Sequence, residues 1–437
     1  MSLTVQKYWL KLRRQSVAFL VLAMSANALS YVYQLVMARL LNPAEYAVVL
    51  AIVSFIAILL FPSNAYQAAV AVGTGHISAK GSFADAWPFA LRAAYIGGSL
   101  ALGLALILLA MGDPVRTIFG FEGSWVLNWL ALTFFLSLIL SSLRGAFQGG
   151  HRFALLGALM FVEAATRVVI SILLVILGYG VAGATAGFAI GFAIAAVMAV
   201  WLLWPRHHDT TSVNTESLWI TLRDQLQAVP ATFAVFGVQA IDVVIANYKL
   251  ATIQMEPFSA AALAGRVTFY AAFVLGLLML PRFTEMFSRK QWRTEQVHKS
   301  FFVMAGISIG PLVAAFLVPE VIHNLLVGPR YTSDPTLLRT YLVGTGFLAW
   351  SLFLTYFLIS AKQHKIWRVL VPVSILQALA YLTIATTTLH FAIILCLGGA
   401  TSCSYLAYSA RKLIKTLSLQ PSMNESDSET FSPSQVL

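Results

Sequence analysis

Apolar blocks alternate with short polar segments along almost the whole chain. A helix of about 20 residues spans a hydrocarbon core about 30 Å thick, and most blocks reach that length. Because a backbone in lipid must satisfy its own hydrogen bonds and the blocks lack two-residue alternation, they predict helices and exclude barrel strands. The fold class is therefore an all-α integral membrane protein. Twelve spans are expected, at residues 16–40, 46–72, 87–111, 123–147, 153–176, 181–204, 226–248, 259–281, 301–318, 337–361, 367–389 and 391–410.

One long polar segment, RHHDTTSVNTE, interrupts the middle of the chain and divides it into two sets of six spans. The tail is rich in serine and acidic residues, without periodicity, which is typical of disorder. The expected organisation is a cytoplasmic amino-terminal segment (1–15), an amino-terminal lobe (16–205), a cytoplasmic linker (206–217), a carboxy-terminal lobe (218–410) and a disordered cytoplasmic tail (411–437).

The two halves resemble each other, which predicts an internal repeat. FQGGHRF ends the fourth span and SAKQHKI ends the tenth, an alignment that pairs His151 with His364. A short segment ending at Gly120 follows the third span, as one ending at Gly328 follows the ninth. Six spans per half give both halves the same orientation. We therefore expect two six-helix bundles related by a pseudo-two-fold axis along the membrane normal, as in several carriers with alternating access.

The charges set the orientation. Only 10 % of the residues are charged, against about a quarter in a soluble protein, and the formal net charge is +11. With the amino terminus in the cytoplasm, twenty of the 28 basic residues fall in cytoplasmic segments or the span ends next to them, five in outer segments or the span ends next to them, and three deeper within spans. This positive-inside bias places both termini in the cytoplasm, and it explains the basic charge without nucleic acid.

Several kinds of catalytic chemistry lack their residues. The sequence has no GxxxxGK[ST] phosphate loop and no cluster of Cys and His at metal-ligand spacing. Its outer segments are too short to form a catalytic domain. The sequence predicts neither an enzyme nor a metal or cofactor site.

The informative residues are ionisable groups inside apolar blocks, because each costs several kcal/mol unless it is paired or hydrated. Glu163 and Arg167 stand four residues apart in the fifth span and can pair. Asp242 and Arg266, in the seventh and eighth spans, come to a similar depth and can meet across the hairpin. Arg92 lies in the third span. Two interpretations stay open: arginines that line a polar cavity and attract an anion, or ion pairs that only hold helices together.

Uncharged polar side chains accompany these groups. Asn27, Tyr31 and Gln34 follow i, i+4, i+7 spacing, so they form one stripe that faces protein or a water-filled cavity, not lipid. We predict that an anionic head group contacts Arg167, Arg266, Arg92, Asn27, Tyr31, Gln34 and Gln239. Asp242 and Glu163 are expected either to couple an ion or to form structural ion pairs. Glycines every four residues, from Gly183 to Gly191, predict close packing of the sixth span within the bundle, or dimerisation.

Five stretches in order give the chain a family resemblance. MARLLNPAEYAVV (37–49) resembles the A-R-x-L-x-P-x-x-Y/F-G pattern of bacterial polysaccharide and oligosaccharide-lipid flippases, whose superfamily also holds the multidrug-and-toxin extruders. RGAFQGGHRF resembles that family's joint between spans four and five, and AIDVVIANYKL its seventh span. Residues 258–283 resemble its eighth span, and VPEVIHNLLVGPRY the segment after its ninth. The twelve spans argue against the peptidoglycan-precursor branch, which tends to carry fourteen.

The resemblance implies a flippase that translocates a polyprenyl-diphosphate-linked oligosaccharide, a repeat unit of a surface or exopolysaccharide, across the bacterial cytoplasmic (inner) membrane. The arginines would bind the diphosphate, and the lipid tail would stay in the bilayer through a side opening between spans one and eight. Energy would come from an ion gradient or from consumption of the product outside. The expected partners are this substrate, membrane lipids, and a glycan polymerase and glycosyltransferases of the same pathway.

Three alternatives remain open. A cation-coupled multidrug antiporter of the same fold would need an acidic cavity, whereas this chain has as many arginines as carboxylates at depth. A membrane-embedded sugar polymerase or glycosyltransferase usually needs a large outer loop, which the chain lacks. A non-transporting scaffold is compatible with the sequence.

Overall fold

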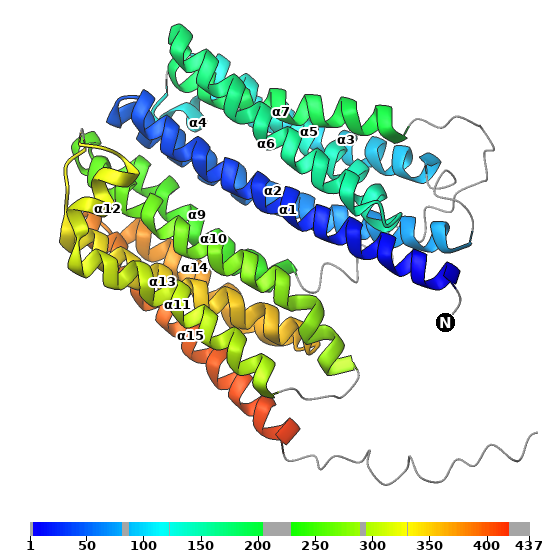
Figure 1. The fold of residues 1–437 in the computed structure, drawn as a ribbon. Helices are drawn as coiled ribbons and strands as arrows, with labels where there is room; N and C mark the ends of the chain where they lie inside the picture. The colour runs from blue at the N-terminus through cyan, green and yellow to red at the C-terminus, as the bar shows by residue number, and fades with distance from the viewer. Residues whose placement is uncertain are drawn as a thin grey trace, which may run out of the picture.

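The computed structural model describes residues 3–80, 87–121, 123–203, 229–288, 294–329 and 331–418, which are mainly helical and contain no strand. The amino-terminal bundle contains α1 (Leu3–Leu40), α2 (Pro43–Lys80), α3 (Trp87–Ala110), α5 (Trp125–Gly149), α6 (Phe153–Leu174) and α7 (Gly180–Leu203), with the short helix α4 (Gly112–Phe119) after α3. The carboxy-terminal bundle contains α9 (Val229–Lys249), α10 (Thr252–Ser288), α11 (Thr294–Leu317), α13 (Pro335–Ser360), α14 (Trp367–Thr383) and α15 (Thr388–Ser418), with the short helix α12 (Pro319–Leu326) after α11. Within the described residues, twelve long helices in two bundles confirm the expected fold class (Figure 1).

Ten stretches of the described residues are apolar and long enough to cross a membrane, and α14 is a shorter apolar helix. The longest of the ten, Phe153–Leu203, has 51 residues and contains two spans. Its backbone turns in the π-helix η2 (Val175–Tyr179) between α6 and α7, where Gly178 has φ 91° and the following Gly180 has φ 47°. Because these are left-handed conformations that glycine adopts without a Cβ clash, the two glycines allow α6 and α7 to pack against each other.

Two boundaries differ from the sequence prediction. Disorder was expected from residue 411, but α15 continues to Ser418. Basic residues fill its last turns, among them Arg411 and Lys415, where they interact favourably with the negative end of the helix dipole. The amino-terminal segment is likewise helical from Leu3. The expected linker at 206–217 and the tail from residue 419 lie outside the described residues.

Equivalent connections in the two bundles share the same backbone. After α5 the left-handed residue is His151 (φ 54°), and after α13 it is Lys362 (φ 60°). In both, the next N–H donates to the carbonyl five residues back, at 2.8 and 3.0 Å, which is the Schellman closure of a helix end. Gly120 after α4 (φ 68°) and Gly328 after α12 (φ 87°) match in the same way. The repeat therefore pairs His151 with Lys362 and not with His364, because helix ends, not histidines, set the register.

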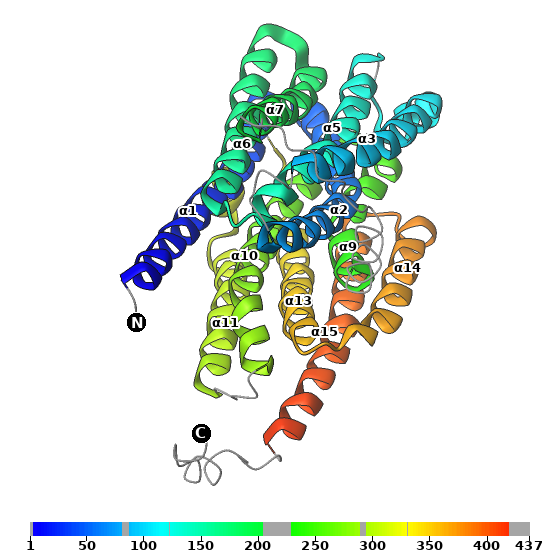
Figure 2. The same cartoon turned by 90° about the vertical axis from the view of Figure 1, so that its right-hand side faces the viewer.

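The two bundles converge at one end and diverge at the other (Figure 1). The short helices α4 and α12 lie at the converging end, which we call the closed end, and the amino terminus lies at the opposite end. Figure 2 shows α2 near the centre of the molecule, where it packs against α9 and α10 of the other bundle. The Phe61 ring of α2 contacts the rings of Phe233 and Phe236 of α9, each at 5.5 Å between centroids. The bundles thus meet through α2 and α9 on one side of the interface.

Candidate functional site

Hydrogen bonds hold the two bundles together at the closed end. Three side chains donate to backbone carbonyls of the opposite bundle: Arg39 to Leu325 (2.7 Å), Tyr331 to Ala38 (2.8 Å) and Asn247 to Phe119 (2.9 Å). The Tyr331 ring also meets the Tyr46 ring edge to face, at 6.0 Å between centroids. These contacts join α1, α2 and α4 of one bundle to α9, α12 and the loop after α12 of the other. They must break before a passage can open at this end.

A cavity of about 390 Å³ lies between the bundles and is walled by α1, α2, α6, α7 and α10. On α1 the cavity is lined from Met24 to Gln34. At a rise of about 1.5 Å per residue, Gln34 lies about 9 Å and Met24 about 24 Å from Leu40, the last residue of the helix. This is mid-depth in a hydrocarbon core about 30 Å thick. The cavity is lined by Met24, Asn27, Ala28, Ser30, Tyr31, Tyr33, Gln34, Val53, Ile56, Ala57, Leu60, Arg167, Phe188, Val267, Tyr270, Ala271, Phe273 and Val274.

Most of this lining is apolar, and its polar part comes mainly from α1. Asn27, Tyr31 and Gln34 all line the cavity, so the predicted polar stripe faces it. The Tyr31 hydroxyl is buried and has no hydrogen-bond partner among the described residues. A buried hydroxyl in this position calls for a water molecule or a ligand to complete its hydrogen bonding.

The cavity opens sideways between α1 and α10. Its lining includes exposed residues of both helices, namely Met24 (47 % exposed) and Val267 (38 % exposed). Asn27 and Ala28 of α1 are exposed as well. Since α1 and α10 are the first and eighth spans, the opening lies where the family resemblance implied one. An amphipathic molecule can place an apolar tail in this opening while its polar part enters the cavity.

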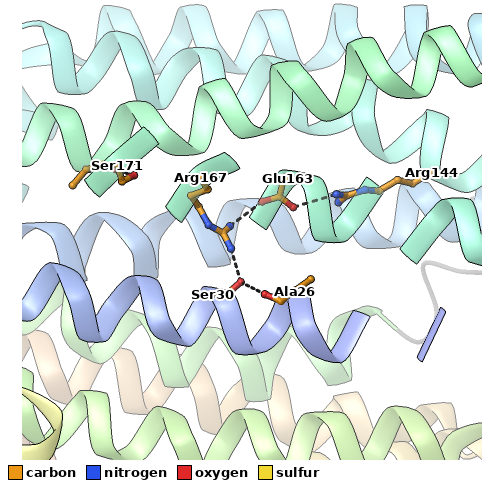
Figure 3. A network of polar contacts seen from close by, with 7 residues as sticks. Ala26, Ser30, Arg144, Glu163, Arg167 and Ser171 are labelled. Carbon is orange, nitrogen blue, oxygen red and sulfur yellow. Dashed lines mark hydrogen bonds and ion pairs between the residues drawn. The ribbon is translucent and has the colours of Figure 1, made fainter. Parts of the chain in front are cut away.

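A buried charge cluster borders the cavity on the side of α6 (Figure 3). Glu163 accepts from Arg167 at 2.9 Å, as the spacing in the sequence predicted, and from Arg144 of α5 at 3.1 Å. Arg167 also donates to the hydroxyl of Ser30, which itself donates to the Ala26 carbonyl at 2.9 Å. These side chains are nearly buried, between 10 and 12 % exposed for the three charged ones. Two arginines and one carboxylate leave the cluster with a net charge of +1.

Arg167 is the charged residue of this cluster that reaches the cavity. Its guanidinium stacks over the Phe188 ring, 4.7 Å from the centroid, and both residues line the cavity wall. A guanidinium over the face of an aromatic ring keeps its N–H donors directed away from the ring, where they can contact oxyanions such as carboxylates and phosphates. The predicted role of Arg167 in binding an anion remains a prediction, but its position is suitable.

Arg266 lies next to the cavity and not on its wall. It is 3 % exposed, and it donates to Gln34 of α1 at 2.7 Å and to the hydroxyl of Ser54 of α2. No carboxylate of the described residues comes within 4 Å of it, so the expected meeting with Asp242 does not occur as an ion pair. Arg266 of α10 instead binds two helices of the opposite bundle, α1 and α2. Its charge is one hydrogen bond away from the cavity, behind Gln34.

The remaining predicted residues lie away from the cavity wall. Asp242 is fully buried and accepts from the Tyr341 hydroxyl of α13 at 2.5 Å and from the Val243 N–H at 2.7 Å. Gln239, one turn earlier on α9, is buried and has no hydrogen-bond partner for its amide among the described residues. Arg92 is exposed and is the sixth residue of α3, which begins at Trp87. A long side chain there reaches the headgroup layer, so Arg92 is not placed to contact a ligand in this cavity.

The glycines of α7 set the position of the charge cluster. A methyl group at Gly191 would lie 2.8 Å from the Glu163 carbonyl, and one at Gly187 would lie 2.7 Å from the Arg167 carbonyl and overlap the Ser171 hydroxyl. The close approach of α7 to α6 therefore depends on glycine at the turns that carry Glu163 and Arg167. This packing within the bundle confirms the first of the two interpretations of the glycine spacing.

Gly187→Ala is expected to destabilise the protein by about 1–3 kcal/mol, because the added methyl group must push α7 away from the α6 backbone. Alanine favours a helix over glycine by about 1 kcal/mol, so the intrinsic effect has the opposite sign. The matched control is Gly103→Ala on α3, where a methyl group meets nothing within 4 Å. Thermal unfolding of both variants in detergent measures the difference. A Gly187→Ala variant as stable as Gly103→Ala would contradict the packing argument.

Solved structures share this fold, whereas no protein-family model and no curated protein matches the sequence. One is an outward-facing conformation of a multidrug resistance MATE family transporter of the MOP superfamily (TM-score 0.62, 15 % identity, 93 % of this chain and 97 % of that chain). Another is an inward-facing conformation of such a transporter (TM-score 0.63, 15 % identity, 93 % and 99 %). A third is a MOP superfamily transporter from Pyrococcus furiosus, described as having a binding pocket of reverse polarity that suggests a different function (TM-score 0.53, 17 % identity, 93 % and 96 %). At these identities the similarity establishes the fold and not the substrate.

Proposed function

We propose that the protein is an alternating-access exporter that moves a lipid-linked anion, a polyprenyl-diphosphate-linked oligosaccharide, across the bacterial cytoplasmic membrane. The observation that carries the proposal is an excess of buried positive charge beside a mainly apolar cavity. Arg266 has no carboxylate within 4 Å among the described residues. Three buried or nearly buried arginines, Arg144, Arg167 and Arg266, therefore outweigh two buried carboxylates, Glu163 and Asp242. In a medium of low polarity such a surplus attracts an anion strongly and repels a cation.

The shape of the cavity supports a substrate that is part lipid. An oligosaccharide linked to a diphosphate cannot cross hydrocarbon unaided, whereas a polyprenyl tail is at home there. The sideways opening between α1 and α10 lets the tail stay in the bilayer while the head group occupies the space near Arg167. Sugar hydroxyls form hydrogen bonds with neutral donors and acceptors, and the lining supplies these from Asn27, Tyr31 and Gln34.

The bundles diverge at the end that holds the amino terminus, so this conformation suits the step of a transport cycle in which the cavity is open to the cytoplasm. If the amino terminus is cytoplasmic, as the charge bias predicts, the closed end is the outer one. Export then requires the contacts of Arg39, Tyr331, Asn247 and Arg266 to break while the bundles rock to the outward-open state. Asp242 is our candidate for coupling this change to an ion, because it is fully buried and has a hydroxyl partner instead of a cation.

A second candidate is a cation-coupled multidrug antiporter. The mainly apolar lining favours it, because drug-binding sites are largely hydrophobic. Two of the matched structures are multidrug resistance transporters, but the one from Pyrococcus furiosus illustrates that pocket polarity can differ within this fold. The sign of the preferred ligand separates the two candidates.

Binding by the purified full-length protein in nanodiscs tests the proposal. We expect farnesyl diphosphate to bind at least about tenfold more tightly than farnesol, and its affinity to fall as salt rises, because the diphosphate contacts arginines. Tetraphenylphosphonium, a lipophilic cation, serves as the opposite probe in the same titration. Tighter binding of tetraphenylphosphonium than of farnesyl diphosphate would favour the antiporter and exclude the proposed substrate class.

A further inference from the structure

Glu163 is shared by two arginines, and only one of them reaches the cavity. Arg167 lines the cavity wall, whereas Arg144 approaches Glu163 from α5, on the other side, and is not part of the lining. Figure 3 shows the carboxylate between the two guanidinium groups, with Arg167 on the side of α1. The two carboxylate oxygens are divided between them, one for each arginine. Arg144 therefore has no direct access to a ligand in the cavity, although it belongs to the same charge network.

This division matters because a buried carboxylate needs a counter-charge at every stage of a transport cycle. If Arg167 were the only partner of Glu163, an anion that drew Arg167 away would leave a second negative charge unpaired beside it. Removing one partner of a buried ion pair is strongly unfavourable. With Arg144 in place, the carboxylate keeps a partner at 3.1 Å while Arg167 changes acceptor. The surplus of one positive charge is thus available to a ligand.

We propose that Arg144 is a positioning residue for the substrate anion: it retains Glu163, so that Arg167 can exchange the carboxylate for a phosphate oxygen in the cavity. This inference rests on the proposed function and identifies the phosphate part of the substrate as the group that Arg167 binds. Arg144 acts through Glu163 and does not touch the ligand.

The surroundings of Arg167 allow such an exchange. Its Nη2 donates to Ser30 and its Cζ lies over the Phe188 ring, 4.7 Å from the centroid, so two contacts hold the guanidinium at the wall when Nη1 leaves Glu163. The Nε atoms of Arg167 and Arg144 are buried and have no acceptor among the described residues. Nη1 and Nη2 share one edge of the guanidinium, so once Nη1 leaves Glu163 a phosphate can accept from Nη1 and from the second N–H of Nη2 together, which is a bidentate contact.

The helices that carry the cluster pack closely against their neighbours, which opposes a shift of their backbone when Arg167 changes its hydrogen-bond acceptor. A methyl group at Gly145, next to Arg144, would lie 2.6 Å from the Gln67 carbonyl, which shows how closely α5 packs on α2. On the other side, α7 packs on the turns of α6 that carry Glu163 and Arg167. We therefore expect a change of partner to move the arginine side chains and not the backbone.

Charge variants of the full-length protein in nanodiscs test the inference, with farnesyl diphosphate as the probe. Arg144→Met leaves Glu163 to neutralise Arg167, and we expect affinity to fall at least about tenfold. In Arg144→Met/Glu163→Gln the surplus charge returns, and affinity should recover to near the wild-type value. Arg144→Lys keeps the charge and should bind like the wild type. Arg116→Met, which removes an exposed arginine paired with Asp113 in α4, should not change binding.

Glu163→Gln provides an independent measurement that keeps both arginines. It raises the net charge of the cluster from +1 to +2, and we expect farnesyl diphosphate to bind several times more tightly than to the wild type. Wild-type affinity in Arg144→Met, or a double variant as weak as Arg144→Met, would overturn the inference. Because a merely structural pair can also tolerate the loss of both partners, the tighter binding of Glu163→Gln is the result that assigns the effect to the charge offered to the ligand. If the wild type itself fails to bind farnesyl diphosphate, the proposed function fails as well. Weak binding confined to Arg144→Met and its double variant contradicts only the role of Arg144.

Discussion

Replacing Arg266 by methionine is expected to open the closed end and to reduce export by about 100-fold. The variant loses the hydrogen bonds that Arg266 donates to Gln34 and Ser54, which join α10 to α1 and α2. A hydrogen bond from a charged donor contributes about 1.5–3 kcal/mol, so two of them contribute about 3 kcal/mol or more. That amount corresponds to a shift of about 100-fold between the two conformations. A carrier held in one conformation turns over slowly, because both must be populated in each cycle.

Distances between spin labels measure this shift. Met111 and Val321 are exposed near α4 and α12, on opposite bundles, and cysteines there take the labels once Cys396 and Cys403 are replaced by serine. We expect the label distance to lengthen in Arg266→Met and to stay constant in Arg116→Met, whose arginine pairs within its own bundle. An unchanged distance in Arg266→Met would show that Arg266 does not hold the bundles together.

Arg266→Lys separates the charge from the geometry. An ammonium group keeps the positive charge but lacks the planar fork that reaches two acceptors at once. We expect an intermediate distance distribution, together with affinity for farnesyl diphosphate close to that of the wild type. Equal effects of lysine and methionine would assign the role of Arg266 to hydrogen-bond geometry alone.

The helices were predictable from the sequence because burial in lipid leaves the backbone few alternatives. Each apolar block became a helix near its expected bounds, and the polar stripe of Asn27, Tyr31 and Gln34 faces the cavity as its spacing predicted. Helix ends were less predictable, since α15 continues to Ser418, past the apolar block. Hydropathy measures the preference for lipid, whereas a helix can extend into water by satisfying its own hydrogen bonds.

The partners of the buried charges were predictable only within one helix. Glu163 and Arg167 pair because four residues bring them to the same face, which sequence spacing reveals. Arg144 lies near the cytoplasmic end of the fourth expected span, where a basic residue is ordinarily explained by orientation alone, yet it is nearly buried and binds Glu163. The hairpin turns near His151, so Arg144 and Glu163 lie at unequal distances from the turn, and the length of the arginine side chain makes up the difference. Contacts of that kind depend on side-chain reach and crossing angles, which periodicity does not encode.

The pairing of Asp242 with Arg266 failed for a related reason. Equal depth on neighbouring helices is necessary for contact but does not fix which face each residue occupies. Asp242 faces α13 and accepts from Tyr341, while Arg266 faces the opposite bundle. Asp242 therefore forms contacts inside the carboxy-terminal bundle, whereas Arg266 forms contacts between the two bundles.

Locking the closed end is expected to abolish transport almost completely. Arg39 and Leu325 are exposed, belong to different bundles and lie close enough for the Arg39 guanidinium to reach the Leu325 carbonyl at 2.7 Å. In the cysteine-free background, Arg39→Cys/Leu325→Cys can be joined by a short bismaleimide. The link fixes the bundles as described here, so an alternating-access carrier can no longer open this end. The measurement is the transport of labelled substrate, as uptake into inverted vesicles or release from right-side-out vesicles. Each single-cysteine variant, treated with the same reagent, is the control.

The same lock distinguishes an alternating-access carrier from a non-transporting scaffold or a fixed channel. In a carrier that binds from the diverging end, the locked protein should retain its affinity for farnesyl diphosphate while losing transport, because the cavity between α1 and α10 remains as described. Loss of binding together with transport would mean that the link distorts the cavity, which the single variants would not explain. Undiminished transport after complete cross-linking would rule out a cycle that opens the closed end. The substrate would then have to leave sideways between α1 and α10, and the rocking of the two bundles would not be the transport step.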